Sequence, residues 1–231
     1  MSRTAVFNRN SGMDHHEKQP FDFDDAYRRY LAGLLSSDRQ QCRLSFTQWL
    51  ESNSDLRTLY EDLVQRSLYQ VGELWERGQV SVATEHLATA ITESLLNLTY
   101  PLLFSHPRVG KTAIVTCVAS EYHQVGAKMI ADIFELNGWR GYFLGANTPL
   151  RDLTALIMEK HPDVVALSVT VAFNLDKLIN FATEIRKVFA DLPIIVGGQG
   201  FRWGGRERVE RLPGVRCLTT LSELQKWILE N

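Results

Sequence analysis

Along the N-terminal part of the chain, apolar residues recur every three or four positions, which predicts amphipathic helices. The repeat is clearest at 54–79, where Leu56, Leu59, Leu63 and Val71 fall on one helical face. Weaker stripes of the same kind cover the segments 23–37, 38–52 and 81–104. Four helices joined by short connections predict a helical bundle over residues 21–106.

Capping residues mark where these helices begin and end. Serine favours the N-cap of a helix, so Ser54 and Ser81 are expected to precede the third and fourth helices. Gly78 suits the end of the third helix, because glycine adopts the backbone conformation that ends helices. Pro107 and Gly110 then predict a linker, since both residues interrupt regular structure.

The hydrophobic pattern changes after residue 110. Short apolar runs now alternate with amphipathic segments, and the runs lie at 112–118, 141–145, 164–170, 193–198 and 215–219. The predicted helices between and after them lie at 124–137, 149–160, 174–190, 203–211 and 221–230. Continuous apolar strands separated by helices are typical of a parallel sheet that is covered on both faces. The predicted fold class is therefore α/β, with the bundle as an N-terminal cap and a flavodoxin- or Rossmann-like parallel five-stranded sheet over 110–231.

Composition and charge exclude several classes of function. The chain has 231 residues and a formal net charge of -2, so it carries no broad basic surface for nucleic acid. It has no apolar run long enough to span a membrane and no apolar N-terminal signal, so we expect a cytoplasmic protein. Zinc sites and disulfide frameworks need closely spaced or paired cysteines, and this chain has only the distant Cys42, Cys117 and Cys217.

Residues 1–20 are polar and lack periodicity, which predicts a flexible tail. Within it, Asp14, His15 and His16 are metal-ligating types, but an adjacent histidine pair in a tail is more often solvated. We therefore expect no metal site there.

Residues that could bind a ligand lie where the predicted strands end. The loop after the first strand contains Glu121, Tyr122, His123, Gln124, Val125 and Gly126. The third strand closes with Ser168 and Thr170, and the fourth with Gly197 and Gly198. Parallel sheets of this type bind ligands beyond the carboxyl ends of their strands, so one ligand can meet all three segments.

The composition of these loops limits what the ligand can be. An acid beside His123 would orient the imidazole so that its other nitrogen ligates a metal. A phosphate-binding loop would need a Gly-x-x-x-x-Gly-Lys pattern, which is absent, and a zinc ion would need further local ligands. Taken singly, a loop histidine and a pair of turn glycines are also compatible with no ligand at all.

Together these loops resemble the cobalamin-binding domains of the methionine synthase and mutase class. That class carries Asp-x-His-x-x-Gly, Ser-x-Leu and Gly-Gly in this order. Here Glu121-x-His123-x-x-Gly126 is followed after 41 residues by Ser168-x-Thr170 and after 26 more by Gly197-Gly198. The resemblance implies a base-off, His-on cofactor. His123 would be the lower axial cobalt ligand, and the dimethylbenzimidazole tail would enter a slot beside the serine, threonine and glycines. Glu121 and Thr170 depart from the usual aspartate and leucine.

The bundle contains a second resemblance. Trp75 is followed after nine residues by Glu85 and His86, as in cobalamin-dependent photoreceptors, whose helical cap covers the upper face of the cofactor. Trp75 as bundle core, with Glu85 and His86 as ordinary first-turn residues, is the simpler structural explanation. The best-known photoreceptors have a histidine directly after the tryptophan, where this chain has Glu76, so a bis-imidazole light product is not implied.

These resemblances favour a non-enzymatic sensor: a cobalamin-binding, light-responsive regulator of transcription. The layout resembles stand-alone antirepressors, which implies a protein partner such as a transcriptional repressor and no direct contact with nucleic acid or membrane. Adenosyl-, methyl- and hydroxocobalamin are all candidate cofactors, and a homo-oligomer is possible. A corrinoid methyl carrier of a methyltransferase system is the alternative, and an interaction module with a vestigial site is a third hypothesis.

Overall fold

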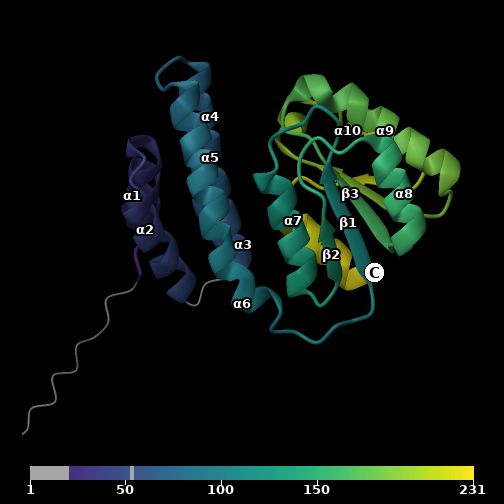
Figure 1. The fold of residues 1–231 in the computed structure, drawn as a ribbon, viewed down its shortest axis with the longest axis horizontal. Helices are drawn as coiled ribbons and strands as arrows, with labels where there is room; N and C mark the ends of the chain where they lie inside the picture. Colours follow the sequence, from purple (N-terminus) through teal and green to yellow (C-terminus); the bar gives the residue numbers. More distant parts are fainter. Residues whose placement is uncertain (1–20, 53–54) are drawn as a thin grey trace, which may run out of the picture.

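The computed structural model describes residues 21–52 and 55–231, and it confirms the predicted α/β fold with a helical cap (Figure 1). The sheet has five parallel strands in the order β2-β1-β3-β4-β5. The strands are β1 (Thr112–Cys117), β2 (Arg140–Phe143), β3 (Val164–Ser168), β4 (Ile194–Gly197) and β5 (Val215–Cys217). The central strand β3 is buried along its whole length, as its continuous apolar run requires. The expected tail at 1–20, with Asp14, His15 and His16, lies outside the described residues.

Helices cover both faces of the sheet. The helices of this half are α7 (Val125–Leu136), α8 (Leu150–Lys160), α9 (Leu175–Val188), α10 (Arg206–Glu210) and α11 (Leu221–Glu230). Two short 3-10 helices, η3 (Ala172–Asn174) and η4 (Gln199–Trp203), follow β3 and β4. The helices α7 and α11 share one continuous apolar core with the cap, whereas α8, α9 and α10 pack in a second core on the other face.

The cap consists of helices that run beside α7 (Figure 1). They are α1 (Phe23–Ser36), α2 (Arg39–Glu51), α3 (Leu56–Thr58), η1 (Leu59–Gln65), α4 (Arg66–Glu76), α5 (Val82–Leu96), η2 (Asn97–Thr99) and α6 (Tyr100–Leu103). Ser81 caps α5 as expected, with its hydroxyl accepting a hydrogen bond from the Thr84 amide. The glycine end of α4 is also as expected, since Gly78 has a positive φ of 68°.

Two sequence expectations concern the start and the course of the third cap helix. Ser54, the expected N-cap, lies outside the described residues, and the Asp55 side chain accepts from the Arg57 amide in the first turn of α3. The predicted helix at 54–79 is not α-helical throughout, because η1 is a π-helical segment. Within η1, Tyr60 reaches across to the sheet half of the molecule, and its hydroxyl donates to Asp132 on α7 at 2.8 Å. The π-helical segment η1 therefore lies where the cap contacts α7.

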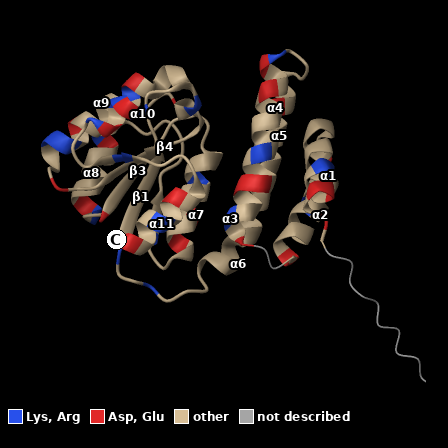
Figure 2. Cartoon of the chain, turned by 180° about the vertical axis from the view of Figure 1, so that it is seen from behind, with Lys and Arg blue, Asp and Glu red and all other residues tan. Residues whose placement is uncertain are grey.

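Charge is distributed without a dominant sign. Figure 2 shows basic and acidic residues interspersed along the helices of both halves, with no continuous basic face in that view. Within the ranges 21–52 and 55–231, no helix combines the length and apolar character that crossing a membrane requires.

Candidate functional site

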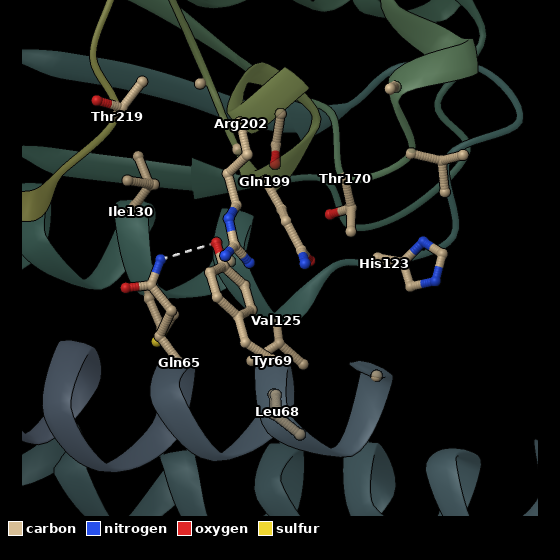
Figure 3. A pocket seen from close by; sticks show the side chains of 18 of the residues that line it. Gln65, Leu68, Tyr69, His123, Val125, Ile130, Thr170, Gln199, Arg202 and Thr219 are labelled. Carbon is tan, nitrogen blue, oxygen red and sulfur yellow. Dashed lines mark hydrogen bonds between the residues drawn. The ribbon is translucent and has the colours of Figure 1, made fainter. Parts of the chain in front are cut away.

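A cavity of about 910 Å³ lies between the cap and the carboxyl ends of the strands. The cap contributes α4 and α5, and the sheet contributes the loops that follow β1, β3 and β4. Figure 3 shows side chains from both sides pointing into this space. Ten of the predicted site residues line it: Trp75, Glu85, His86, His123, Val125, Gly126, Ser168, Thr170, Gly197 and Gly198. The fold thus brings together segments that are far apart in the sequence.

His123 is held by the acid two positions before it. The distance between His123 Nδ1 and Glu121 Oε1 is 2.5 Å, and Glu121 is fully buried while the imidazole remains half exposed. The second carboxylate oxygen of Glu121 accepts hydrogen bonds from the amides of Thr170 and Val171, at 2.9 and 3.0 Å. One carboxylate therefore orients the imidazole and ties the loop after β1 to the loop after β3.

This network determines the charge states of the pair. Burial alone would raise the pKa of Glu121, but the hydrogen bonds from His123 and from the backbone amides outweigh it and lower the pKa to about 2. The hydrogen bond to Glu121 raises the pKa of His123. An imidazole that donates through Nδ1 to a carboxylate keeps Nε2 for a metal ion, which is the usual arrangement of metal-binding histidines.

The glycines of the site have distinct steric roles. At Gly198, where φ is 115°, a Cβ would collide with the Val169 carbonyl oxygen, and at Gly197 it would collide with that of Leu218. These two glycines let the ends of β3, β4 and β5 approach each other closely. At Gly126, apart from its chain neighbours and its own helix backbone, no atom lies within 4 Å of the Cβ position, so this glycine keeps cavity space open instead.

The cap side of the cavity carries an exposed aromatic ring and a second acid–imidazole pair. Trp75 lies at the end of α4 and is 47% exposed, so it is not part of the bundle core. In the first turn of α5, His86 Nδ1 lies 2.7 Å from Glu85 Oε2, and the Thr89 hydroxyl donates to the other oxygen of Glu85. The cavity therefore has an oriented imidazole on each side.

Three predicted residues do not line the cavity. Glu121 is buried and accepts a hydrogen bond from His123, so it contacts the imidazole rather than the cavity. Tyr122 is in the same loop and is 68% exposed. The Gln124 side chain donates to Glu93 on α5 at 2.9 Å and accepts from the Ala146 amide. Gln124 thus connects the histidine loop to the same cap helix that carries Glu85 and His86.

Sequence reasoning missed several lining residues. Val82 lies between Trp75 and Glu85, and Tyr69 and Gly72 face the cavity from α4. A glycine inside a helix lowers helix stability. Its presence at position 72 could therefore have indicated that another element packs closely there, or that space is needed for a ligand. Apart from its chain neighbours and its own helix backbone, no atom lies within 4 Å of its Cβ position, which matches the second possibility. Arg202, on η4, gave no signal of its own.

The side chains that could ligate a metal are too few for a bare ion and favour a metal that is already held in a cofactor. In the part of the chain that the structure describes, no group of three or more His, Cys, Asp and Glu residues could hold a metal ion. Cys42, Cys117 and Cys217 are all buried, and burial raises the pKa of the Cys117 thiol to about 12, which disfavours the thiolate that binds metals. An oriented imidazole on each side of a large cavity, without a cluster of further ligands among the described residues, fits a metal macrocycle.

Comparison with known families agrees with this chemistry. Residues 111–218 match the B12 binding domain family, and residues 26–99 match a second B12 binding domain family that covers the cap. The chain belongs to the cobalamin-binding proteins that join such a cap to a Rossmann-like domain. Its cofactor is cobalamin, as the sequence motifs predicted.

Among curated proteins, the chain is similar to two transcriptional regulators of Myxococcus xanthus. It is 32% identical over 124 residues to the HTH-type transcriptional repressor CarA, covering 54% of this chain and 43% of that protein. It is 28% identical over 145 residues to the HTH-type transcriptional repressor CarH, covering 62% and 48% respectively. The matched region is thus less than half of each relative.

Among solved structures, the chain resembles the monomethylamine corrinoid protein of Methanosarcina barkeri. The TM-score is 0.76, with 12% identity, over 90% of this chain and 99% of the other. At this identity the similarity concerns the fold alone.

Proposed function

We propose that this protein is a light-responsive, cobalamin-binding regulator of transcription that acts through a protein partner. The observation that carries the proposal is the cavity itself. The Glu121-oriented His123 lies on its sheet side, and the cap supplies Trp75 and the Glu85–His86 pair. In this proposal residues 21–106 form the cap and residues 110–231 hold the cofactor.

On the sheet side, we assign His123 as the lower axial ligand of cobalt in a base-off, His-on mode. Its Nδ1 is engaged by Glu121, which keeps the ring in one orientation. Ser168, Thr170 and the two glycines would hold the dimethylbenzimidazole tail, since all four line the cavity. Thr170 presents its backbone amide to Glu121, so the slot and the axial ligand share one carboxylate.

On the cap side, the upper ligand is the proposed sensing group. An adenosyl- or methylcobalamin supplies a cobalt–carbon bond that green light breaks. Trp75 and Val82 line the space that an upper group would fill, and both side chains are about half exposed. Because packed interfaces respond to lost volume by rearrangement, the cap would change its packing when that group leaves.

Two contacts can carry such a change between the halves. Glu93 on α5 accepts from Gln124 beside His123, and Glu61 accepts from the Leu221 amide at the start of α11. The cap helix with the upper-side residues is therefore hydrogen-bonded to the loop with the lower ligand. A repacked cap would present a different surface to a partner.

The similarity to CarA and CarH supports a role in transcription. The interspersed surface charges support a protein partner, such as a repressor, rather than DNA contacts from this region. We place the protein in the cytoplasm, without catalytic activity of its own and with the capacity to form homo-oligomers.

A corrinoid methyl carrier is the second candidate, and the shared fold with the monomethylamine corrinoid protein favours it. In that function the cap would give a methyltransferase access to the cofactor. The methyl group would then pass between enzymes in the dark.

The test is to load the purified protein with adenosyl- or methylcobalamin in darkness and remove free cofactor. Absorption spectra and the elution volume on a sizing column are then recorded before and after green light. The proposal predicts photolysis together with a change in size or partner binding. Since free alkylcobalamins also photolyse, a spectral change with unaltered size and partner binding would contradict the sensor. Light-independent methyl transfer with a methyltransferase would establish the carrier.

A further inference from the structure

Arg202 lies on the loop that forms the proposed tail slot. The one-turn helix η4 begins directly after Gly198, and it is fixed in place at two points. The Gly200 amide donates to the Val169 carbonyl at 3.1 Å, and the Phe201 side chain is buried. Figure 3 shows the Arg202 side chain extending from this anchored turn into the cavity, toward Tyr69 of the cap.

The guanidinium of Arg202 is weakly engaged by its protein neighbours. Its Nη1 lies 3.9 Å from Glu73 Oε1, which is too long for a hydrogen bond. Its Cζ lies 5.2 Å from the centre of the Tyr69 ring, and the side chain is half exposed. Exposed pairs of this kind contribute little to stability, so the cation remains available to another anion.

Most of the charged residues in the cavity wall are acidic. Four glutamates line it: Glu61, Glu73, Glu76 and Glu85. The other lining arginine, Arg77, is more exposed than Arg202 and lies 3.8 Å from Glu73 beyond the end of α4. Arg202 is therefore the arginine that the sheet half places among these acids, and an anionic ligand group would find its favourable position there.

Cobalamin brings one such group. Its corrin side chains are neutral amides, whereas a phosphodiester joins the corrin to the ribose of the nucleotide tail. When the tail enters the slot beside Gly197 and Gly198, this phosphodiester has to lie between the corrin and that slot. Arg202 is four residues after Gly198, on the same loop. The planar donor fork of arginine matches phosphate oxygens in charge and geometry.

We infer that Arg202 binds the phosphodiester of the cofactor's nucleotide tail. It makes the site selective for complete cobalamins over corrinoids that lack the nucleotide. The inference rests on the tail-in-slot mode of the proposed function, and it is independent of the light response.

Arg202 has one competing role, which is to hold the cap closed through Glu73. The two roles make opposite predictions for Glu73→Gln. If Arg202 acts through Glu73, this variant reproduces the loss caused by Arg202→Gln. If Arg202 serves the phosphodiester, Glu73→Gln removes a competing acid and leaves cobalamin affinity intact or stronger.

The experiment measures, in the dark, the dissociation constants of methylcobalamin and methylcobinamide, which share the corrin and the upper methyl group. Methylcobinamide lacks the base, ribose and phosphate. Wild type, Arg202→Gln, Glu73→Gln and the matched control Arg77→Gln are titrated at low and high salt. We expect Arg202→Gln to weaken methylcobalamin binding about tenfold, which is the scale of one charge-assisted contact, and to lower its salt dependence. The affinity of Arg202→Gln for methylcobinamide should change little. The affinity of Arg77→Gln for methylcobalamin should also change little, and that of Glu73→Gln should be intact or stronger.

An equal loss for both corrinoids in Arg202→Gln would overturn the inference, as would no loss or the same loss in Glu73→Gln. If methylcobinamide binds too weakly to titrate, the contrast between Arg202→Gln and Glu73→Gln at two salt concentrations decides alone. A wild-type protein that binds both corrinoids equally would contradict the tail-in-slot mode itself. A wild-type preference for methylcobalamin that survives in Arg202→Gln would contradict only the role of Arg202.

Discussion

Two histidines line the cavity from opposite sides, and each is paired with a carboxylate. His123 is bound to Glu121 across 2.5 Å, and His86 to Glu85 across 2.7 Å. The surroundings of the two acids differ. Glu121 is fully buried and also accepts from two amides of the β3 loop, whereas Glu85 is partly exposed and its other partner is Thr89 on the same helix.

The difference separates a fixed imidazole from an adjustable one. The carboxylate that orients His123 is buried and is held by two loops at once, so the position of this imidazole is tied to the end of the sheet. His86 is positioned by one helical turn, and its side chain is 74% exposed, so it can reorient without breaking the core. A permanent axial ligand suits the first arrangement, and an exchangeable upper site suits the second.

The largest effect is expected from Glu121→Ala. The variant leaves the Thr170 and Val171 amides buried without partners, and each such loss costs on the order of 1–3 kcal/mol. We expect the free energy of unfolding to fall by about 3 kcal/mol, against less than about 1 kcal/mol for the matched variant Glu85→Ala. Urea denaturation of the cofactor-free proteins, followed by circular dichroism, measures both. Equal losses would mean that the two acid–imidazole pairs do not differ as described.

His123→Ala tests ligation with less structural damage, because half of this side chain is exposed. We expect cobalamin affinity to fall at least about tenfold and the visible spectrum to change, with the cofactor-free protein about as stable as wild type. Spectral titration and a thermal melt provide the two readouts. Unaltered affinity and spectrum would refute the ligand role.

Trp75→Ala is expected to act on the upper side alone. Its ring is 47% exposed, so the loss of stability should be small, while the relative affinities for adenosyl-, methyl- and hydroxocobalamin shift by a few-fold. The measurement is competition binding in the dark among the three cofactors. A uniform loss of affinity for all three would instead indicate a general packing role for the ring.

His86→Ala is expected to have the smallest effect in darkness. Its dark spectrum with methylcobalamin should equal that of wild type, and the illuminated spectrum should differ if the imidazole takes the vacated upper position. Paired dark and light spectra at one pH measure this effect. Wild-type spectra in both conditions would remove His86 from the upper site.

The fold was largely predictable because apolar periodicity and glycine placement specify a parallel sheet almost strand by strand. The α/β class and the cobalamin cofactor were predicted correctly. The interrupted cap helix was not predictable, since the π-helical segment depends on Tyr60 reaching a buried aspartate on α7. Local propensity carries no information about such a tertiary contact.

The sequence motifs predicted which residues lie at the site better than they predicted which contacts those residues make. Motif spacing predicted ten residues that line the cavity, and it predicted Glu121 as the acid that orients His123. Tyr122 and Gln124 were also expected at the site but do not line the cavity, and Gln124 hydrogen-bonds to Glu93 of the cap instead. Arg202 was missed because an arginine in a loop has no periodic pattern, and only the folded chain places it among the glutamates of the cavity wall.

The central claim is that His123 replaces the cofactor's own base on cobalt. Electron paramagnetic resonance of the bound cob(II)alamin, in protein labelled with ¹⁵N only at histidine, tests it directly. The axial nitrogen splits the cobalt lines into triplets when it is ¹⁴N and into doublets when it is ¹⁵N. The account predicts doublets in the labelled wild type and their loss in His123→Ala. Triplets that persist in the labelled protein would show that dimethylbenzimidazole remains on cobalt and would contradict the account.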